Sequence, residues 1–328
     1  MKPLVPLVIA LLALTVLPAS AGTFAEREEV QAFIAEMQEK HGLDGVRLTR
    51  LFARARPIPA VLKAIAPPAD PRIRSWQAYR ARFIEPKRIA AGLRFMRQHR
   101  AALARAEAKT GVPAEIIAAI IGIETIYGRQ LGRFDTFAAL ATLAFDYPPR
   151  AELFRRELEA LLLLAREAQR PPDSYRGSYA GAIGLPQFLP SSIRHYAVDF
   201  DRDGRIDLVG SAEDAIGSVA NFLKDHGWQE GGPLAIPVKV GAGETAVDAL
   251  IGEGILPQRR PQEMKAFGVD IPADAPDAPA ALIDLVTPGE PTEYWLGYQN
   301  FYVLTRYNRS SFYAMAVVRF AQQLREQP

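Results

Sequence analysis

Apolar residues recur at helical spacing through the first third of the chain. Between residues 24 and 99 they fall three or four positions apart, with arginine and glutamate between them; an example is the set Val30, Phe33, Ile34 and Met37. Five prolines between residues 57 and 71 divide this region into short helices and turns. The pattern predicts a helical lobe over residues 22–104.

A denser apolar pattern follows. Pro113 occupies a position that the first turn of a helix tolerates, and residues 116–123 are all isoleucine, alanine or glycine. Two further helices are predicted over residues 136–145 and 150–169, the second with four consecutive leucines. This apolar density predicts the core of the protein, over residues 105–230.

The composition changes after Trp228. Short strand patterns between turns cover residues 233–246 and 281–287, and a longer aromatic-rich strand is predicted over residues 293–306. These strands predict a small β lobe over residues 231–306. A last helix, at 311–325, belongs to a segment of residues 307–328 that is predicted to pack back on the core. The predicted fold class is therefore mainly α, of the α+β type.

The amino acid composition limits the class of protein. At 328 residues, 49% of them hydrophobic and 23% charged, the chain is long enough to bury a sizeable core. It has no cysteine, which excludes disulfides and a lipid attached through an N-terminal cysteine. A net charge of +2 is compatible with binding to a polymer that carries acidic peptides, and it does not indicate nucleic-acid binding.

The first 21 residues have the pattern of a signal peptide. Lys2 is followed by an apolar stretch over residues 4–17 and by the small residues Ala19, Ser20 and Ala21. The alternative, an uncleaved membrane anchor, is weaker because the stretch is shorter than a membrane-spanning helix and includes Pro6. We predict export to the periplasm, cleavage after Ala21 and no stable membrane anchor.

Glu124 is a single carboxylate at the end of an apolar run. Packing among isoleucines removes water from the charged form, so the pKa is expected to rise towards roughly 6, where glutamate serves as a general acid. Alternatively, Glu124 leaves the helix and points into solvent, which is the commoner situation for an isolated glutamate. Ordinary glycosidases use two carboxylates, and the sequence offers only one in such a setting.

An acidic segment resembles the first half of an EF-hand calcium loop. Asp199, Asp201 and Asp203 stand at alternate positions, Gly204 provides the sharp turn, and the Arg205 carbonyl takes the seventh position. The alternative is an acidic turn that caps a helix. We favour bound Ca²⁺ because three converging carboxylates would otherwise repel one another, and a structural role because a sensor needs paired loops.

The last ligand position of this loop departs from the EF-hand pattern. Position twelve of an EF-hand loop is a glutamate, but this chain has Gly210 there. Glu213 and Asp214, at the start of the next predicted helix, are the candidates.

The sequence shows no motif typical of zinc or serine-hydrolase catalysis. The four histidines show no metal-ligand spacing, and no G-x-S-x-G motif is present. The aromatic residues between 294 and 313 fit either a core or a set of platforms for sugar stacking. Zinc and serine-hydrolase mechanisms therefore have no support.

Several segments, taken in order, resemble the lytic murein transglycosylase B family. They span most of the chain after the leader: residues 111–113, 121–125, 177–182, 187–192, 214–221 and 306–310. The resemblance implies a lysozyme-like helical core with a helical lobe and a small β lobe. It also implies non-hydrolytic cleavage of the β-1,4 bond between MurNAc and GlcNAc in peptidoglycan.

The resemblance assigns roles to individual residues. Glu124 matches the catalytic acid/base, Ser178 a serine that contacts the sugar, and Gln187 a glutamine of the substrate cleft. Further matches to cleft residues are Tyr79, Tyr307, Asn308 and Tyr313. The implied partners are peptidoglycan glycan strands, with cell-wall synthases as candidate protein partners.

Two positions depart from the family pattern. Phe222 stands where some relatives have a cleft tyrosine, and the spacer between Asp207 and Asp214 is one residue longer than in the best-known member. Three other functions stay open at this point: a lysozyme that uses water on the same fold, a peptidoglycan-binding protein with an inert Glu124, and a calcium-responsive regulator.

Overall fold

The structure, a computed structural model, describes residues 23–67, 74–241 and 244–326. The predicted signal peptide lies outside the described residues. The chain divides into two compact units, one up to Arg56 and one from Pro57 onwards. The lobe boundaries predicted at residues 104, 230 and 306 stay predictions. In the described part of the chain, no helix combines the length and the apolar character needed to cross a membrane.

The first unit is a small helical cluster. It contains a 3-10 turn, Phe24–Glu26, and the helices α1 (Glu28–His41) and α2 (Gly45–Arg54). The rings of Phe24 and Phe33 lie edge to face against Phe52, with centroids 6.5 and 6.1 Å away. The spacing of apolar residues at i, i+3 and i+4 brings these rings to one side of each helix.

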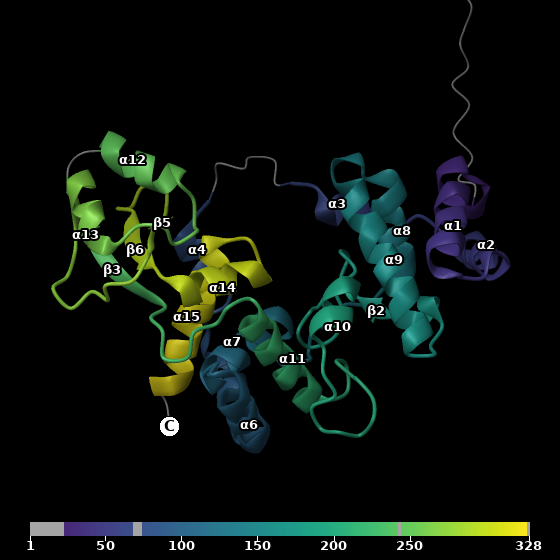
Figure 1. The fold of residues 1–328 in the computed structure, drawn as a ribbon, viewed down its shortest axis with the longest axis horizontal. Coiled ribbons are helices and arrows are strands. Elements are labelled where there is room, and N and C mark those ends of the chain that lie inside the picture. Colours follow the sequence, from purple (N-terminus) through teal and green to yellow (C-terminus); the bar gives the residue numbers. More distant parts are fainter. Residues whose placement is uncertain (1–22, 68–73, 242–243, 327–328) are drawn as a thin grey trace, which may run out of the picture. The chain divides into compact units, whose positions relative to one another are not determined.

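Most of the second unit is helical (Figure 1). Its helices before the sheet are α3 (Pro59–Ile65), α4 (Trp76–Ala81), α5 (Pro86–Gln98), α6 (Arg100–Thr110), α7 (Ala114–Thr125), α8 (Thr136–Asp146), α9 (Ala151–Glu167), α10 (Pro190–Tyr196) and α11 (Ala212–Asp225). Two more, α14 (Gln299–Tyr307) and α15 (Ser311–Glu326), follow the sheet.

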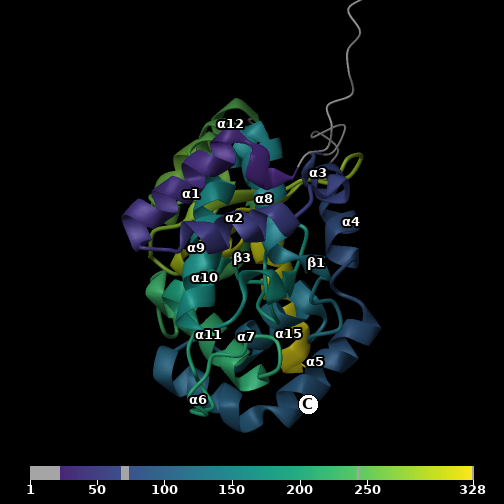
Figure 2. The ribbon, with the colours of Figure 1, turned by 90° about the vertical axis from the view of Figure 1, so that its right-hand side faces the viewer.

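Helix α7 lies at the centre of this unit. Every residue from Ile116 to Ile123 is buried. Helices α5, α6, α11 and α15 pack around α7, and α8 packs against α9 (Figure 2). A helix that is apolar on all sides must be covered on all sides, which explains why α7 is the core helix.

Two small antiparallel sheets complete the second unit. The four-stranded sheet has the order β4-β3-β6-β5, made of Val269–Asp270, Ala235–Val240, Glu293–Gly297 and Ala281–Leu285. Leu282 and Leu296 form part of its core, which also contains residues of the helices α12 (Glu244–Gly252) and α13 (Pro261–Met264). The second sheet pairs β1 (Phe134–Asp135) with β2 (Arg176–Gly177). The prediction of a mainly helical α+β fold is confirmed.

The long strand predicted over residues 293–306 is wrong. The strand ends at Gly297, and α14 begins two residues later. The side chain of Asn300 explains the change, because its amide accepts a hydrogen bond from the Gln229 N–H and donates one to the Gln229 carbonyl. The strand predicted over residues 233–246 is likewise shorter, since β3 covers only Ala235–Val240.

Candidate active site

Glu124 lies in the last turn of α7 and is partly buried. Its Oε1 accepts a hydrogen bond of 2.7 Å from the hydroxyl of Tyr313, a buried residue of α15. Burial raises the Glu124 pKa to about 7, and the Tyr313 hydrogen bond opposes this rise. The direction agrees with the sequence prediction, and the value lies above the roughly 6 expected there. At neutral pH this carboxyl can therefore both give and take a proton.

Burial and the charge of Glu124 raise the pKa values of three tyrosines. Burial, and after it the Glu124 carboxylate, raises the pKa of Tyr79 to about 12 and those of Tyr307 and Tyr313 well above their usual value. All three hydroxyls therefore keep their protons, and those of Tyr307 and Tyr313 donate hydrogen bonds. They come from α4, the end of α14 and α15, so three distant segments meet at Glu124.

Ring contacts hold these tyrosines in place. The rings of Tyr307 and Tyr313 are stacked, with centroids 6.2 Å apart, and the Tyr307 hydroxyl donates to the Pro186 carbonyl at 2.6 Å. The ring centroid of Tyr79 lies 5.0 Å from that of Phe83 and 5.7 Å from that of Phe312. Packed rings lose little entropy on binding a sugar, which suits them to a substrate site.

Ser178 and Gln187 lie in the glycine-rich segment between β2 and α10. The Ser178 Oγ accepts hydrogen bonds from the N–H groups of Ala180 and Ala182, at 3.3 and 3.1 Å, so its own proton stays available to a ligand. Gln187 has a positive φ of 50° and donates to the carbonyls of Gly184 and Leu131. The segment reaches α7 through the Thr125 hydroxyl, which donates to the Leu185 carbonyl at 3.1 Å.

Asn308 follows Tyr307 directly and is exposed. The structure therefore brings Tyr79, Tyr307 and Tyr313 to Glu124 and places Asn308 beside Tyr307. It records no contact of Ser178, Gln187 or Asn308 with Glu124. Their substrate-binding roles stay predictions.

An aromatic cluster extends the site beyond Tyr307. The ring centroid of Phe222 lies 4.9 Å from that of Tyr307 and 4.1 Å from that of His226. The His226 ring also contacts the Tyr196 ring, with centroids 5.1 Å apart. Phe222 thus packs where a tyrosine would present a hydroxyl. Tyr196 and His226 were not predicted from the sequence, although the four-residue spacing between Phe222, in α11, and His226, directly after α11, was an available signal.

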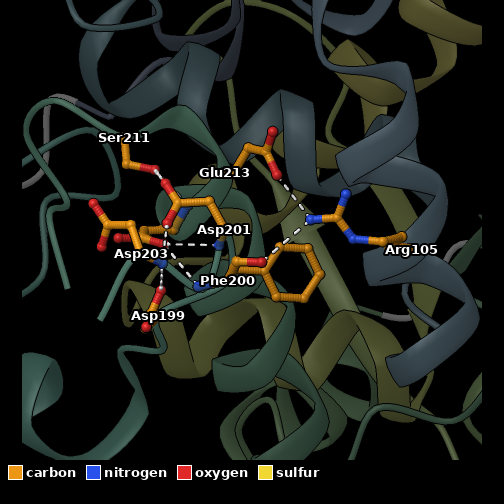
Figure 3. Close-up of polar contacts among 8 residues, drawn as sticks. Arg105, Asp199, Phe200, Asp201, Asp203, Ser211 and Glu213 are labelled. Atoms are coloured by element: carbon orange, nitrogen blue, oxygen red, sulfur yellow. Dashed lines mark hydrogen bonds and ion pairs between the residues drawn. The ribbon is translucent and has the colours of Figure 1, made fainter. Parts of the chain in front are cut away.

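The acidic loop brings three carboxylates together (Figure 3). One carboxylate oxygen from each of Asp199, Asp201 and Asp203 lies within 4.8 Å of the other two. Gly204 has a φ of +88°, the left-handed conformation that the sharp turn requires. This donor set fits a hard cation that prefers oxygen ligands, such as Ca²⁺.

The two candidates for the closing ligand differ in their contacts. Asp214 is 1% exposed, and its carboxylate accepts hydrogen bonds from the N–H groups of Phe200 and Asp207, at 2.7 and 2.8 Å. Glu213 forms an ion pair of 2.7 Å with Arg105, which lies over the Phe200 ring (Figure 3). Neither belongs to the cluster of three carboxylates, so the assignment of Asp214 and of the Arg205 carbonyl as ligands stays a prediction.

Comparison with known proteins places the chain in a family. The sequence model of the family described as "Transglycosylase SLT domain" matches residues 25–322. The membrane-bound lytic murein transglycosylase B of Escherichia coli (strain K12) is 39% identical over 321 residues, which cover 92% of this chain and 84% of that protein. The chain belongs to this transglycosylase family, and its enzyme class is that of the lytic murein transglycosylases.

Solved structures show the same fold. The soluble lytic transglycosylase SltB1 of Pseudomonas aeruginosa matches with a TM-score of 0.83 and 45% identity, over 91% of this chain and 98% of that one. The Escherichia coli lytic transglycosylase Slt35, solved in complex with calcium, has a TM-score of 0.80 and 40% identity, over 93% and 95% of the two chains. Pseudomonas aeruginosa SltB3, solved with NAG-anhNAM-pentapeptide, has a TM-score of 0.76 and 31% identity, over 91% and 79%.

The hydrogen bond between Tyr313 and Glu124 leads to a prediction on pH dependence. We expect Tyr313→Phe to move the basic limb of the kcat–pH profile up by roughly one pH unit. The lost hydrogen bond stabilised the charged carboxylate, so its loss raises the Glu124 pKa and keeps the acid protonated to higher pH. The measurement is the initial rate between pH 5 and pH 9 at saturating substrate, where the profile reports the enzyme–substrate complex.

Tyr298→Phe is the matched control for this substitution. Its hydroxyl donates to the Pro276 carbonyl and not to Glu124. A basic limb that stays in place in Tyr313→Phe, or moves to lower pH, would contradict the prediction.

Proposed function

We propose that the protein cleaves the β-1,4 bond between MurNAc and GlcNAc in peptidoglycan and leaves a 1,6-anhydroMurNAc end. The observation that carries this proposal is the Glu124 carboxyl, whose pKa is raised to about 7 by burial beside the Tyr313 hydroxyl. In the described part of the chain, no second carboxylate contributes to that pKa. A single acid/base is what a reaction completed by the substrate itself requires.

The reaction uses Glu124 twice. Its proton passes to the bridging oxygen as the bond from C1 of MurNAc breaks, and the N-acetyl group of the same sugar assists the departure. The carboxylate then takes the proton of the C6 hydroxyl, and the C6 oxygen attacks C1 to close the anhydro ring. Glu124 ends the cycle protonated, so no water is consumed.

The tyrosines and the neighbouring loop supply the rest of the proposed site. The hydroxyl of Tyr313 holds Glu124, and the stacked rings of Tyr307 and Tyr313 form an apolar wall. Ser178, Gln187, Asn308 and Tyr79 are proposed to bind the glycan strand. SltB3, whose structure contains a NAG-anhNAM-pentapeptide, supports peptidoglycan as the ligand.

The chemical form of the products tests this function. Mass spectrometry of soluble fragments released from purified peptidoglycan is expected to show anhydro-MurNAc ends, 18 Da lighter than hydrated ends because no water is added. Reducing-end MurNAc without anhydro product would instead establish a lysozyme that uses water on the same fold. Absence of released fragments would point to a binding protein.

We also propose that Ca²⁺ is a structural cofactor. Asp199, Asp201, Asp203 and the Arg205 carbonyl would hold it, and Asp214 would close the loop from α11. The carboxylate cluster and the calcium in the structure of Slt35 support this assignment. The ion would join the segment after α10 to the start of α11.

The proposed location is the periplasm, reached by a signal peptide cleaved after Ala21. The relatives include one named membrane-bound and one named soluble. Glycan strands of peptidoglycan are the proposed partner, and cell-wall synthases are candidates for protein contacts. Mass spectrometry of the mature N-terminus after expression in a Gram-negative host, expected to begin at Gly22, tests the cleavage.

A further inference from the structure

Arg88, on α5, is a buried cation whose contacts end beside Glu124. Its side chain is 7% exposed, and its Nη1 donates to the carbonyls of Gly122 and Ile123, at 2.7 and 3.3 Å. The Ile123 carbonyl belongs to the peptide bond that leads to Glu124. Arg88 therefore holds the two peptide groups that precede the proposed acid/base.

The end of α7 needs such a donor. The last carbonyls of a helix lack their usual partners within the helix, and a cation there interacts favourably with the helix dipole. The Gly122 carbonyl also accepts from the Ile126 N–H at 3.1 Å, so the Ile123 carbonyl is the one that depends on Arg88. The second nitrogen of the guanidinium, Nη2, donates to the Arg82 carbonyl at 3.3 Å, so Arg88 also joins α7 to the segment after α4. This segment follows Tyr79, another residue of the site.

Arg88 is not held by a carboxylate. Among the described residues the structure records no ion pair for its guanidinium, and its Nε is buried without a hydrogen-bond partner. Burying a cation is unfavourable, and burial lowers the Arg88 pKa below its ordinary value, although the charge of Glu85 opposes this shift. The arginine thus lies in an unfavourable environment, where its hydrogen bonds go to backbone carbonyls.

The turn that follows Glu124 is strained. Ile126 and Tyr127 have φ angles of 51° and 56°, in the left-handed region that a β-branched residue rarely adopts. Such a conformation persists only where the surroundings fix it. The Tyr127 hydroxyl fills the space beside Gly92 and Gly122, where an added Cβ would come within 2.5 and 2.4 Å of it.

We propose that Arg88 is a positioning residue, which fixes the C-terminal turn of α7 so that the Glu124 carboxyl meets the Tyr313 hydroxyl. The inference rests on the proposed role of Glu124 as the acid/base. Without the guanidinium, the Ile123 carbonyl loses its buried donor, the Gly122 carbonyl keeps only the Ile126 N–H, and the strained turn loses one of its supports. The Glu124 carboxyl then moves out of line with Tyr313.

The test compares Arg88→Met with Arg94→Met, the same change at an exposed position of the same helix. On soluble glycan strands freed of peptide, we expect Arg88→Met to lower kcat by about 10- to 100-fold while KM stays within about twofold. The basic limb of its kcat–pH profile is expected at higher pH, because the Tyr313 hydrogen bond is weakened. Arg94→Met is expected to match the wild type in all three.

Rates are expressed per folded molecule, from circular dichroism and the melting temperature. A purely structural role would lower the folded fraction and leave kcat per folded molecule and the pH profile unchanged, and that result would overturn the proposal. If Arg88→Met does not fold, Arg88→Lys keeps the cation but not the fork of donors. A folded Arg88→Lys with wild-type kcat and pH profile would overturn it equally.

Glu124→Gln, measured alongside, separates this inference from the proposed function. An active Glu124→Gln would refute the role of Glu124 itself. An inactive Glu124→Gln together with wild-type behaviour of the folded Arg88 variants would refute only the role of Arg88.

Discussion

Glu124→Gln is expected to lower the release of anhydro-muropeptides by about 10²- to 10⁴-fold, the range that general acid–base catalysis supplies. Glutamine has nearly the same shape and can still accept the Tyr313 hydrogen bond, so the fold and the site should survive. It cannot protonate the bridging oxygen or remove the C6 proton. Both proton transfers depend on the same side chain, which places the expected loss near the upper end of the range.

Glu115→Gln, in the first turn of the same helix, is the matched control. Its carboxylate forms an ion pair of 3.1 Å with Arg325 and lies about two and a half helical turns from Glu124. Fragments are quantified by mass spectrometry at equal concentrations of folded protein. Retention of more than a tenth of wild-type activity in Glu124→Gln would contradict a single acid/base and favour a mechanism in which another group carries the proton.

The sequence indicates Glu124 because the signal is local. An apolar run of eight residues predicts a buried helix, and a glutamate at its end must share that environment. The three aspartates of the acidic loop are indicated for the same reason, since alternate positions in a short turn bring their carboxylates together. Both predictions depend only on residues that are close together in the sequence.

The rest of the site depends on contacts between distant segments. Tyr313 reaches Glu124 across 189 positions of sequence, and nothing in either segment alone specifies that hydrogen bond. The same holds for Arg88, which by its sequence is one arginine among many on amphipathic helices. The resemblance to a family supplied Tyr79, Tyr307 and Tyr313, but periodicity could not distinguish them from core residues.

The error over residues 293–306 has a similar cause. Aromatic residues favour a strand, but the amide of Asn300 binds the backbone of Gln229, 71 residues away. That contact fixes the start of a helix where local propensity predicts a strand. Tertiary contacts outweigh a difference in β propensity that is worth only about 1 kcal/mol.

The acidic loop and the active site are joined by a short series of hydrogen bonds. The Leu208 carbonyl, one residue after Asp207, accepts from the Leu185 N–H at 2.8 Å. The Leu185 carbonyl in turn accepts from the hydroxyl of Thr125, next to Glu124. A cation bound in the loop would therefore stabilise the surroundings of Glu124 as well as the loop itself.

Removal of calcium is accordingly expected to lower the melting temperature of the protein by about 5–10 °C. An ion at a hundred times its Kd stabilises the folded state by ~2.7 kcal/mol, and each kcal/mol corresponds to roughly 2–4 °C in a unit of this size. The measurement is a thermal melt in excess EDTA and after addition of CaCl₂, with Asp201→Asn expected to lose the response and the exposed Asp248→Asn to keep it. An unchanged melting temperature on chelation would show that the three carboxylates hold no structural ion, and that the hydrogen bonds from Ser211 and the loop backbone suffice to order them.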